Sequence, residues 1–138
     1  MKNLLIILFT FTSVYTFAQG KANLDQKLIG KWEAIAKNET KKTGGKVVDL
    51  DKETYKTGEK TYEFTKNNKL IITQGFGKHR EELPAWTQAN KLFIGKDHPN
   101  KDPYIITYEQ GRVRLLKTEI KQKKGKTIVE TEEVILKK

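Results

Sequence analysis

The sequence predicts an all-β protein, a small antiparallel up-and-down barrel of about eight strands that follows a cleaved signal peptide. Turn residues recur along the chain, as at Gly44-Gly45, Asn67-Asn68 and Gln110-Gly111, and the segments between them are rich in Val, Ile, Thr, Tyr and Phe. Most connections are short. Short connections favour successive hairpins, and closing such a meander removes its exposed edges.

The chain opens in the manner of an exported protein. Lys2 precedes an apolar run over residues 4–17, which ends in Thr16-Phe17-Ala18, a small-residue pattern typical of a cleavage site. The run is shorter than the about 20 apolar residues of a membrane span, and no cysteine follows it that could carry a lipid. We therefore expect residues 1–18 to be a signal peptide and residues 19–138 to be a single domain, periplasmic or secreted and not lipid-anchored.

The segments after the signal peptide alternate between apolar and polar residues with a period of two, as half-buried strands do. Tyr62 and Phe64 share one strand face, and Tyr104 and Tyr108 share another. A short helical turn over residues 24–29 is expected before the first strand. The expected strands are 31–38, 46–50, 61–66, 69–75, 83–88, 91–95, 103–109, 112–121 and 126–136.

The composition excludes several kinds of catalysis. The chain has no cysteine, so it has no disulfide, thiolate metal site or thiol nucleophile, and its one serine, Ser13, lies in the expected signal peptide. The two histidines, His79 and His98, lie in charged segments without the spacing of a metal or acid–base site, and we expect both in solvated loops. We therefore expect no metal, no cofactor and no enzymatic activity.

The charge is strongly basic, with 27 Lys and Arg against 17 Asp and Glu and a formal net charge of +10. Two interpretations stay open: the lysines keep the protein soluble, or they contact anionic envelope components. Nucleic acid is not expected as a partner of an exported protein. Five lysines crowd one expected hairpin: Lys117, Lys121, Lys123, Lys124 and Lys126.

The order of the segments carries a resemblance. The opening Leu28-Ile29-Gly30-Lys31-Trp32 resembles the Gly-x-Trp signature of lipocalins, and the succession Tyr62-Glu63-Phe64, Trp86 and Tyr104-Ile105-Ile106 is similar to that of small exported bacterial lipocalin-like domain proteins. The resemblance implies a barrel with a central cavity for small apolar molecules.

It also implies that Gly30 and Trp32 close one end of that barrel. In lipocalins the ring of the signature Trp stacks under an Arg from a late strand, and here the late-strand arginines are Arg112 and Arg114.

Candidate ligand-binding residues follow from the strand alternation. The aromatic residues of the expected strands could all face inward, where they would form either a ligand-binding wall or an ordinary packed core. Arg114 would meet a ligand carboxylate if its face is interior, and would be solvated if Val113 and Leu115 face inward instead. The candidates are Tyr62, Phe64, Trp86, Tyr104, Tyr108 and Arg114.

Two functions fit the sequence. The first is a non-catalytic binding barrel for a small apolar or amphipathic ligand. The second is an interaction module that uses a basic surface on envelope polyanions or on a protein partner. A hollow, aromatic-lined interior would favour the first, and an interior filled by side chains would favour the second. The sequence does not indicate an oligomeric state.

Overall fold

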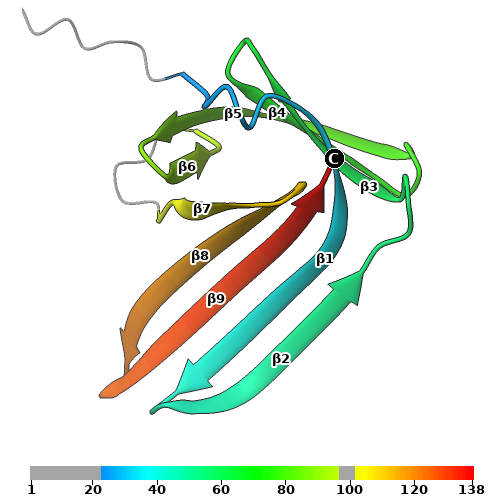
Figure 1. The fold of residues 1–138 in the computed structure, drawn as a ribbon. Helices are drawn as coiled ribbons and strands as arrows, with labels where there is room; N and C mark the ends of the chain where they lie inside the picture. The colour runs from blue at the N-terminus through cyan, green and yellow to red at the C-terminus, as the bar shows by residue number, and fades with distance from the viewer. Residues whose placement is uncertain (1–22, 97–101) are drawn as a thin grey trace, which may run out of the picture.

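The computed structural model describes residues 23–96 and 102–138, and every regular element in this part of the chain is a strand (Figure 1). The expected signal peptide and His98 lie outside the described residues. Among the residues described, none forms a helix long and apolar enough to cross a membrane. The strands are β1 (Gly30–Thr43), β2 (Lys46–Thr54), β3 (Lys60–Thr65), β4 (Lys69–Gln74), β5 (His79–Gln88), β6 (Lys91–Ile94), β7 (Tyr104–Glu109), β8 (Arg112–Lys123) and β9 (Lys126–Lys137).

The strands form one antiparallel sheet in the order β2-β1-β3-β4-β5-β6-β7-β8-β9. Strand β1 also pairs with β9, and this pairing closes eight of the strands into a barrel. Strand β2 pairs with β1 alone and stands outside the closed circle. The expected all-β, up-and-down barrel of about eight strands is therefore confirmed.

Four strands continue beyond the barrel as a flat sheet, which we call the sheet extension (Figure 1). It contains β2, residues 36–43 of β1, residues 117–123 of β8 and residues 126–133 of β9. Strand β1 pairs with β3 only through residues 30–33, and β7 pairs with β8 only as far as Leu116. The extension therefore has one sheet edge at β2 and the other at β8.

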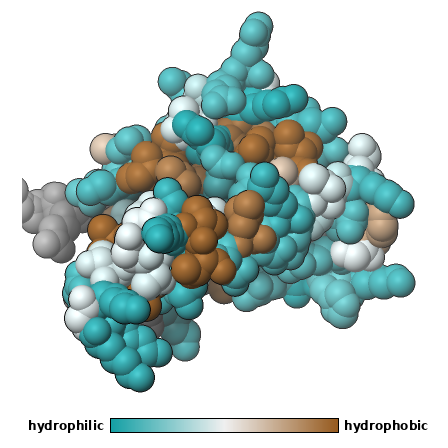
Figure 2. All heavy atoms as spheres, turned by 90° about the horizontal axis from the view of Figure 1, so that it is seen from below, coloured by the Kyte–Doolittle hydropathy of each residue, from teal (hydrophilic) through white to brown (hydrophobic). Residues whose placement is uncertain are grey.

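The sequence underestimated this extension. We expected loops over residues 39–45 and 51–60, whereas β1 runs to Thr43 and β2 runs to Thr54. Every residue of β2 is exposed, so neither of its faces needs the apolar alternation that marks a half-buried strand. Figure 2 shows the face at the bottom of Figure 1, where hydrophilic residues dominate and apolar residues form separate patches.

A segment that precedes β1 crosses one end of the barrel. The backbone N–H of Leu24 donates to Asn68 Oδ1 at 3.1 Å, and the N–H of Thr87 donates to the carbonyl of Asn23 at 3.1 Å. The hydroxyl of Tyr108 donates to Asp25 Oδ2 at 2.8 Å. These bonds tie residues 23–25 to the three hairpins β3–β4, β5–β6 and β7–β8, and the segment therefore plugs the end where those hairpins turn.

The plug contains the short turn expected over residues 24–29, in which the N–H of Leu28 donates to the carbonyl of Asp25 at 2.9 Å.

The core beneath the plug is filled by apolar side chains, each of which stabilises the fold by about 1.5–3 kcal/mol when fully buried. The core residues are Leu24, Leu28, Trp32, Ala34, Tyr62, Phe64, Leu70, Ala85, Leu92, Ile106, Val113, Leu115, Val134 and Leu136.

Trp32 lies in this closed end. Its side chain is 5 % exposed, and its Nε1–H donates to the carbonyl of Leu28 at 2.7 Å. The ammonium of Lys138 lies 5.0 Å from the ring centroid, in the position where we expected Arg112 or Arg114. Lys138, directly after β9, supplies the cation because β9, not β8, is the neighbour of β1. Residue 30 is a glycine because its backbone φ is +127°, a conformation that residues with a side chain rarely adopt.

Candidate ligand-binding cavity

The barrel is hollow towards the end from which the sheet extension leaves. A cavity of about 300 Å³ opens there. Its apolar side chains come from β4, β5, β6, β8 and β9, and its polar side chains come from β1, β3, β4, β7, β8 and β9. The lining residues are Lys37, Lys60, Tyr62, Ile72, Gln74, Leu83, Ile94, Tyr104, Leu115, Lys117, Glu132 and Val134. The lining is therefore amphipathic, as in sites that hold small organic ligands.

Two of the residues predicted to bind a ligand line this cavity. Tyr62 is 7 % exposed and Tyr104 is half-buried, and both contribute their rings to the wall. Phe64, two residues after Tyr62 on the same face of β3, is 1 % exposed and belongs to the packed core. The interior therefore combines the two alternatives left open by the sequence: it is filled at the closed end and hollow at the open end.

The other three predicted residues lie elsewhere. Trp86 stands on the outer face of β5 and stacks on Phe93, with the ring centroids 5.4 Å apart, because it alternates with the buried Ala85. Tyr108 shares the face of Tyr104 but is bound to the plug at the closed end.

Arg114 alternates with the buried Val113 and Leu115, and so it also points outward. Its Nη1 lies 3.7 Å from the carboxylate of Glu133. None of Trp86, Tyr108 and Arg114 lines the cavity. For Arg114 this is the second of the two alternatives that the sequence left open, in which Val113 and Leu115 face inward.

Lys60 places an ammonium beside the cavity. The residue is only 9 % exposed, and its Nζ donates to the hydroxyl of Tyr55 at 3.3 Å. The same Nζ lies 4.9 Å from the ring centroid of Tyr55 and 5.9 Å from that of Tyr62. Burial, and then the neighbouring charge of Lys37, lower the pKa of Lys60 below its ordinary value. The site thus holds a partly desolvated cation that the surrounding rings stabilise.

The tyrosines of the wall are held in the neutral form. The hydroxyl of Tyr104 donates to Glu132 Oε1 at 2.7 Å, and burial together with this carboxylate raises the pKa of Tyr104. Burial, and then the charge of Glu132, raise the pKa of Tyr62 to about 12. Lys117 covers the other side of the Tyr104 ring, with its Nζ 5.4 Å from the centroid. Neutral phenols present O–H groups that can orient a ligand.

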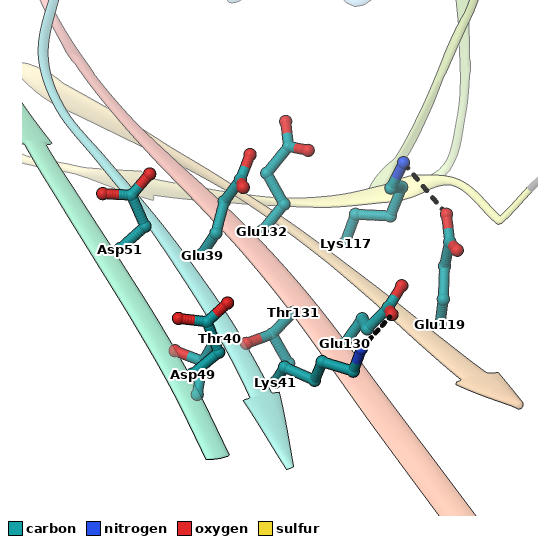
Figure 3. Close-up of a pocket in the computed structure, with 10 residues that line it drawn as sticks. All are labelled: Glu39, Thr40, Lys41, Asp49, Asp51, Lys117, Glu119, Glu130, Thr131 and Glu132. Atoms are coloured by element: carbon teal, nitrogen blue, oxygen red, sulfur yellow. Dashed lines mark ion pairs between the residues drawn. The ribbon is translucent and has the colours of Figure 1, made fainter. Parts of the chain in front are cut away.

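A second cavity of about 420 Å³ lies on the sheet extension, next to the first (Figure 3). The two cavities share Lys117 and Glu132. In Figure 3 the side chains of this second cavity rise from β2, β1, β9 and β8 on one side of the sheet. They are Glu39, Thr40, Lys41, Asp49, Asp51, Lys117, Glu119, Glu130, Thr131 and Glu132.

A bulge in β1 explains why Lys37 was missed. The pairing of β1 with β9 shifts between Ala34 and Ala36, so the residue facing inward changes parity there. Trp32 and Ala34 face inward before the bulge, and Lys37, opposite the buried Val134, continues the inner face after it. The sequence carries a usable signal nonetheless, because charged residues recur at every second position over 37–41, 49–53, 117–121 and 130–132.

The side chains around the cavity offer hydrogen-bonding, charged and apolar groups for binding. Within the described ranges, no group of three or more His, Cys, Asp or Glu side chains is arranged to hold a metal ion. His79 begins β5 and is exposed.

Comparison with known protein families, with curated proteins and with solved structures finds no match for this chain. The architecture, a closed eight-stranded antiparallel barrel with one extra strand, is consistent with a calycin-like fold.

Proposed function

We propose that this chain is an exported, non-catalytic binding protein of the lipocalin-like type, which takes up a small amphipathic ligand at the open end of its barrel. The observation that carries the proposal is the cavity of about 300 Å³, whose wall combines apolar side chains with lysines and tyrosines. Export rests on the signal-peptide pattern of residues 1–18.

The composition of the cavity wall supports an amphipathic ligand over a fully apolar one. Ile72, Leu83 and Val134 can remove an alkyl chain from water, which stabilises a complex by about 25 cal/mol per Å² of apolar surface buried. Lys60 and Tyr104 supply polar groups that would be left without a ligand partner if an apolar molecule filled the whole space.

The experiment measures displacement of an apolar fluorescent dye, together with thermal unfolding in the presence of a lipid panel. We expect a ligand with a Kd near 1 μM, about −8 kcal/mol, and a melting temperature that rises with ligand concentration, because binding to the folded state alone stabilises it. In Ile72→Trp the added ring occupies the cavity, so dye and ligand should bind at least about tenfold more weakly.

Tyr108→Ala is the matched control for Tyr104→Ala. Both residues lie on the same face of β7, but Tyr108 is bound to the plug and only Tyr104 lines the cavity. Tyr104→Ala should weaken ligand binding, and Tyr108→Ala should leave it unchanged while lowering the melting temperature. Equal loss of binding in the two variants, or the absence of any thermal shift across the panel, would contradict the proposal.

A second candidate function rests on the tip of the β8–β9 hairpin. Lys123, Lys124 and Lys126 are exposed there, and no carboxylate of the described residues forms an ion pair with them. These three ammonium groups could bind an anionic polymer of the cell envelope through their charge alone.

A further inference from the structure

The lysines around the barrel cavity differ in whether a carboxylate neutralises them. Lys37 forms an ion pair with Glu39 at 2.5 Å, and Lys117 forms one with Glu119 at 3.2 Å. Lys60 is the most buried of the three, and no carboxylate of the described residues forms an ion pair with it. An ammonium next to an apolar cavity, satisfied only by a hydroxyl and two aromatic rings, is one that an incoming anionic group would neutralise.

The neighbouring cavity on the sheet extension carries the opposite charge. Its lining has six carboxylates and two lysines, and the carboxylates of Asp49 and Asp51 form no ion pair with any described residue. Glu53 lies opposite Lys37 in the pairing of β1 with β2, so Asp51 stands two residues farther from the barrel. Two residues of a strand span about 6.6 Å. The unpaired charges therefore follow a fixed order: a cation at the barrel cavity, then anions beyond it.

We propose that the ligand is a single-chain zwitterionic amphiphile whose anionic group adjoins its apolar chain and whose cationic group lies beyond, the charge order of an alkyl phosphocholine. The inference rests on the proposed function and adds the chemistry of the head group. The alkyl chain enters the barrel cavity, the phosphate meets Lys60, and the ammonium reaches the carboxylates of Asp51 and Asp49.

Simpler head groups match only part of this surface. A fatty acid would neutralise Lys60 and leave the carboxylates of the sheet extension without a partner. A cationic amphiphile whose charge adjoins its chain would bring that charge against Lys60, where like charges repel. The zwitterion would place its phosphate next to the ammonium of Lys60 and its own ammonium next to the carboxylates of Asp51 and Asp49.

The experiment compares two detergents with the same alkyl chain, each below its micelle concentration, by isothermal titration calorimetry on the mature protein. One is an alkyl phosphocholine. The other is an alkyl sulfobetaine, in which the ammonium adjoins the chain and the sulfonate is terminal, so that the charge order is inverted. We expect the phosphocholine to bind at least about tenfold more tightly than the sulfobetaine.

Variants test each end of the head group. Lys60→Met should weaken phosphocholine binding and reduce the difference between the two detergents. Asp49→Asn combined with Asp51→Asn should weaken phosphocholine binding but leave binding of an alkyl phosphate, which lacks the ammonium, unchanged or tighter. Both aspartates are exposed on β2, so the fold should survive. The control is Glu63→Gln, which removes an exposed carboxylate from the outer face of β3.

The outcomes separate the inference from the proposed function. Tighter binding of the phosphocholine, lost in Lys60→Met and in the double variant but not in Glu63→Gln, supports the inference. Equal binding of the two detergents, or tighter binding of the sulfobetaine, overturns the inference and leaves the binding function in place. If neither detergent, nor the dye, nor any lipid of the panel binds, the proposed function fails and this inference fails with it.

Discussion

The two ends of the barrel differ in the surroundings of one buried residue at each end, Trp32 and Lys60. At the closed end, Trp32 is buried and hydrogen-bonded, and Lys138 lies over its ring. At the open end, Lys60 lies between tyrosine rings and borders an unfilled volume. Trp32 is satisfied within the protein, whereas Lys60 forms an ion pair with no carboxylate of the described residues. We therefore expect stability to depend on Trp32, and recognition of the proposed ligand to depend on Lys60.

Replacing Trp32 tests the closed end. Trp32→Ala should lower the free energy of unfolding by roughly 3–5 kcal/mol, because a large buried ring leaves a cavity that the surroundings only partly fill. Trp86→Ala is the matched control, because the chain has two tryptophans and Trp86 lies on the outer surface. It should lose only about 0.5–1.5 kcal/mol of ring stacking. Urea unfolding measures both values, and equal losses would show that Trp32 does not anchor the core.

Tyr62 gives the open end a pH dependence. Its pKa in the folded protein is about 12, above the ordinary value of 10.0, because burial and then the charge of Glu132 oppose the phenolate. A pKa that is raised on folding stabilises the protein fully below pH 10, and the contribution, roughly 2–3 kcal/mol for two pH units, is lost as pH rises through 12.

The unfolding free energy of the wild type should therefore fall more steeply between pH 10 and 12 than that of Tyr62→Phe. Tyr104 and Tyr55, whose pKa values are also raised, remain in both proteins, so the difference between the two slopes reports Tyr62. Parallel slopes in the two proteins would contradict this assignment.

At the scale of the elements, the sequence predicted the strands well wherever one face is buried. The alternation of Tyr62 with Phe64 and of Leu70 with Ile72 gave β3 and β4 nearly to the residue, because an apolar core face imposes a period of two. The resemblance to the Gly-x-Trp signature, rather than the alternation, indicated that Gly30 and Trp32 lie at the start of the first strand. The class of fold followed from these strands and the short turns between them.

The sequence predicted a strand over residues 46–50, the first part of β2, but not its continuation to Thr54 or the direction of the β1 side chains after the bulge. Every residue of β2 is exposed, so no buried apolar face marks where the strand ends. The bulge at Ala34–Ala36 is a one-residue shift that nothing in the local composition marks, yet it turns Lys37 rather than Ala36 inward. That shift accounts for Lys37 alone. Lys60 and Lys117 share the strand faces of Tyr62 and Leu115, and they were not predicted because a charged side chain was not expected on an inner face.

At the scale of the whole molecule, the charges are unevenly distributed. The chain carries a formal net charge of +10, yet the cavity on the sheet extension collects carboxylates. The five lysines predicted to form one basic patch are divided accordingly. Lys117 forms an ion pair with Glu119, and Lys121 forms ion pairs with Glu119 and Glu130. The other three lysines form no ion pair with described residues and lie at the hairpin tip: Lys123, Lys124 and Lys126.

Because only the three lysines at the hairpin tip lack ion pairs with described residues, binding to an anionic polymer can be tested with these three alone. If the hairpin tip binds an anionic polymer, the protein should elute from a heparin column at a salt concentration that falls markedly when the three free lysines are changed to glutamine. Exposed charges are screened within about 10 Å at about 0.1 M salt, so the interaction should also weaken steeply as salt rises. The matched control removes the same charge from three exposed lysines near the closed end of the barrel: Lys31, Lys66 and Lys91. An equal fall in both triple variants would show that retention reflects net charge alone, and would leave the hairpin tip without a specific part in binding.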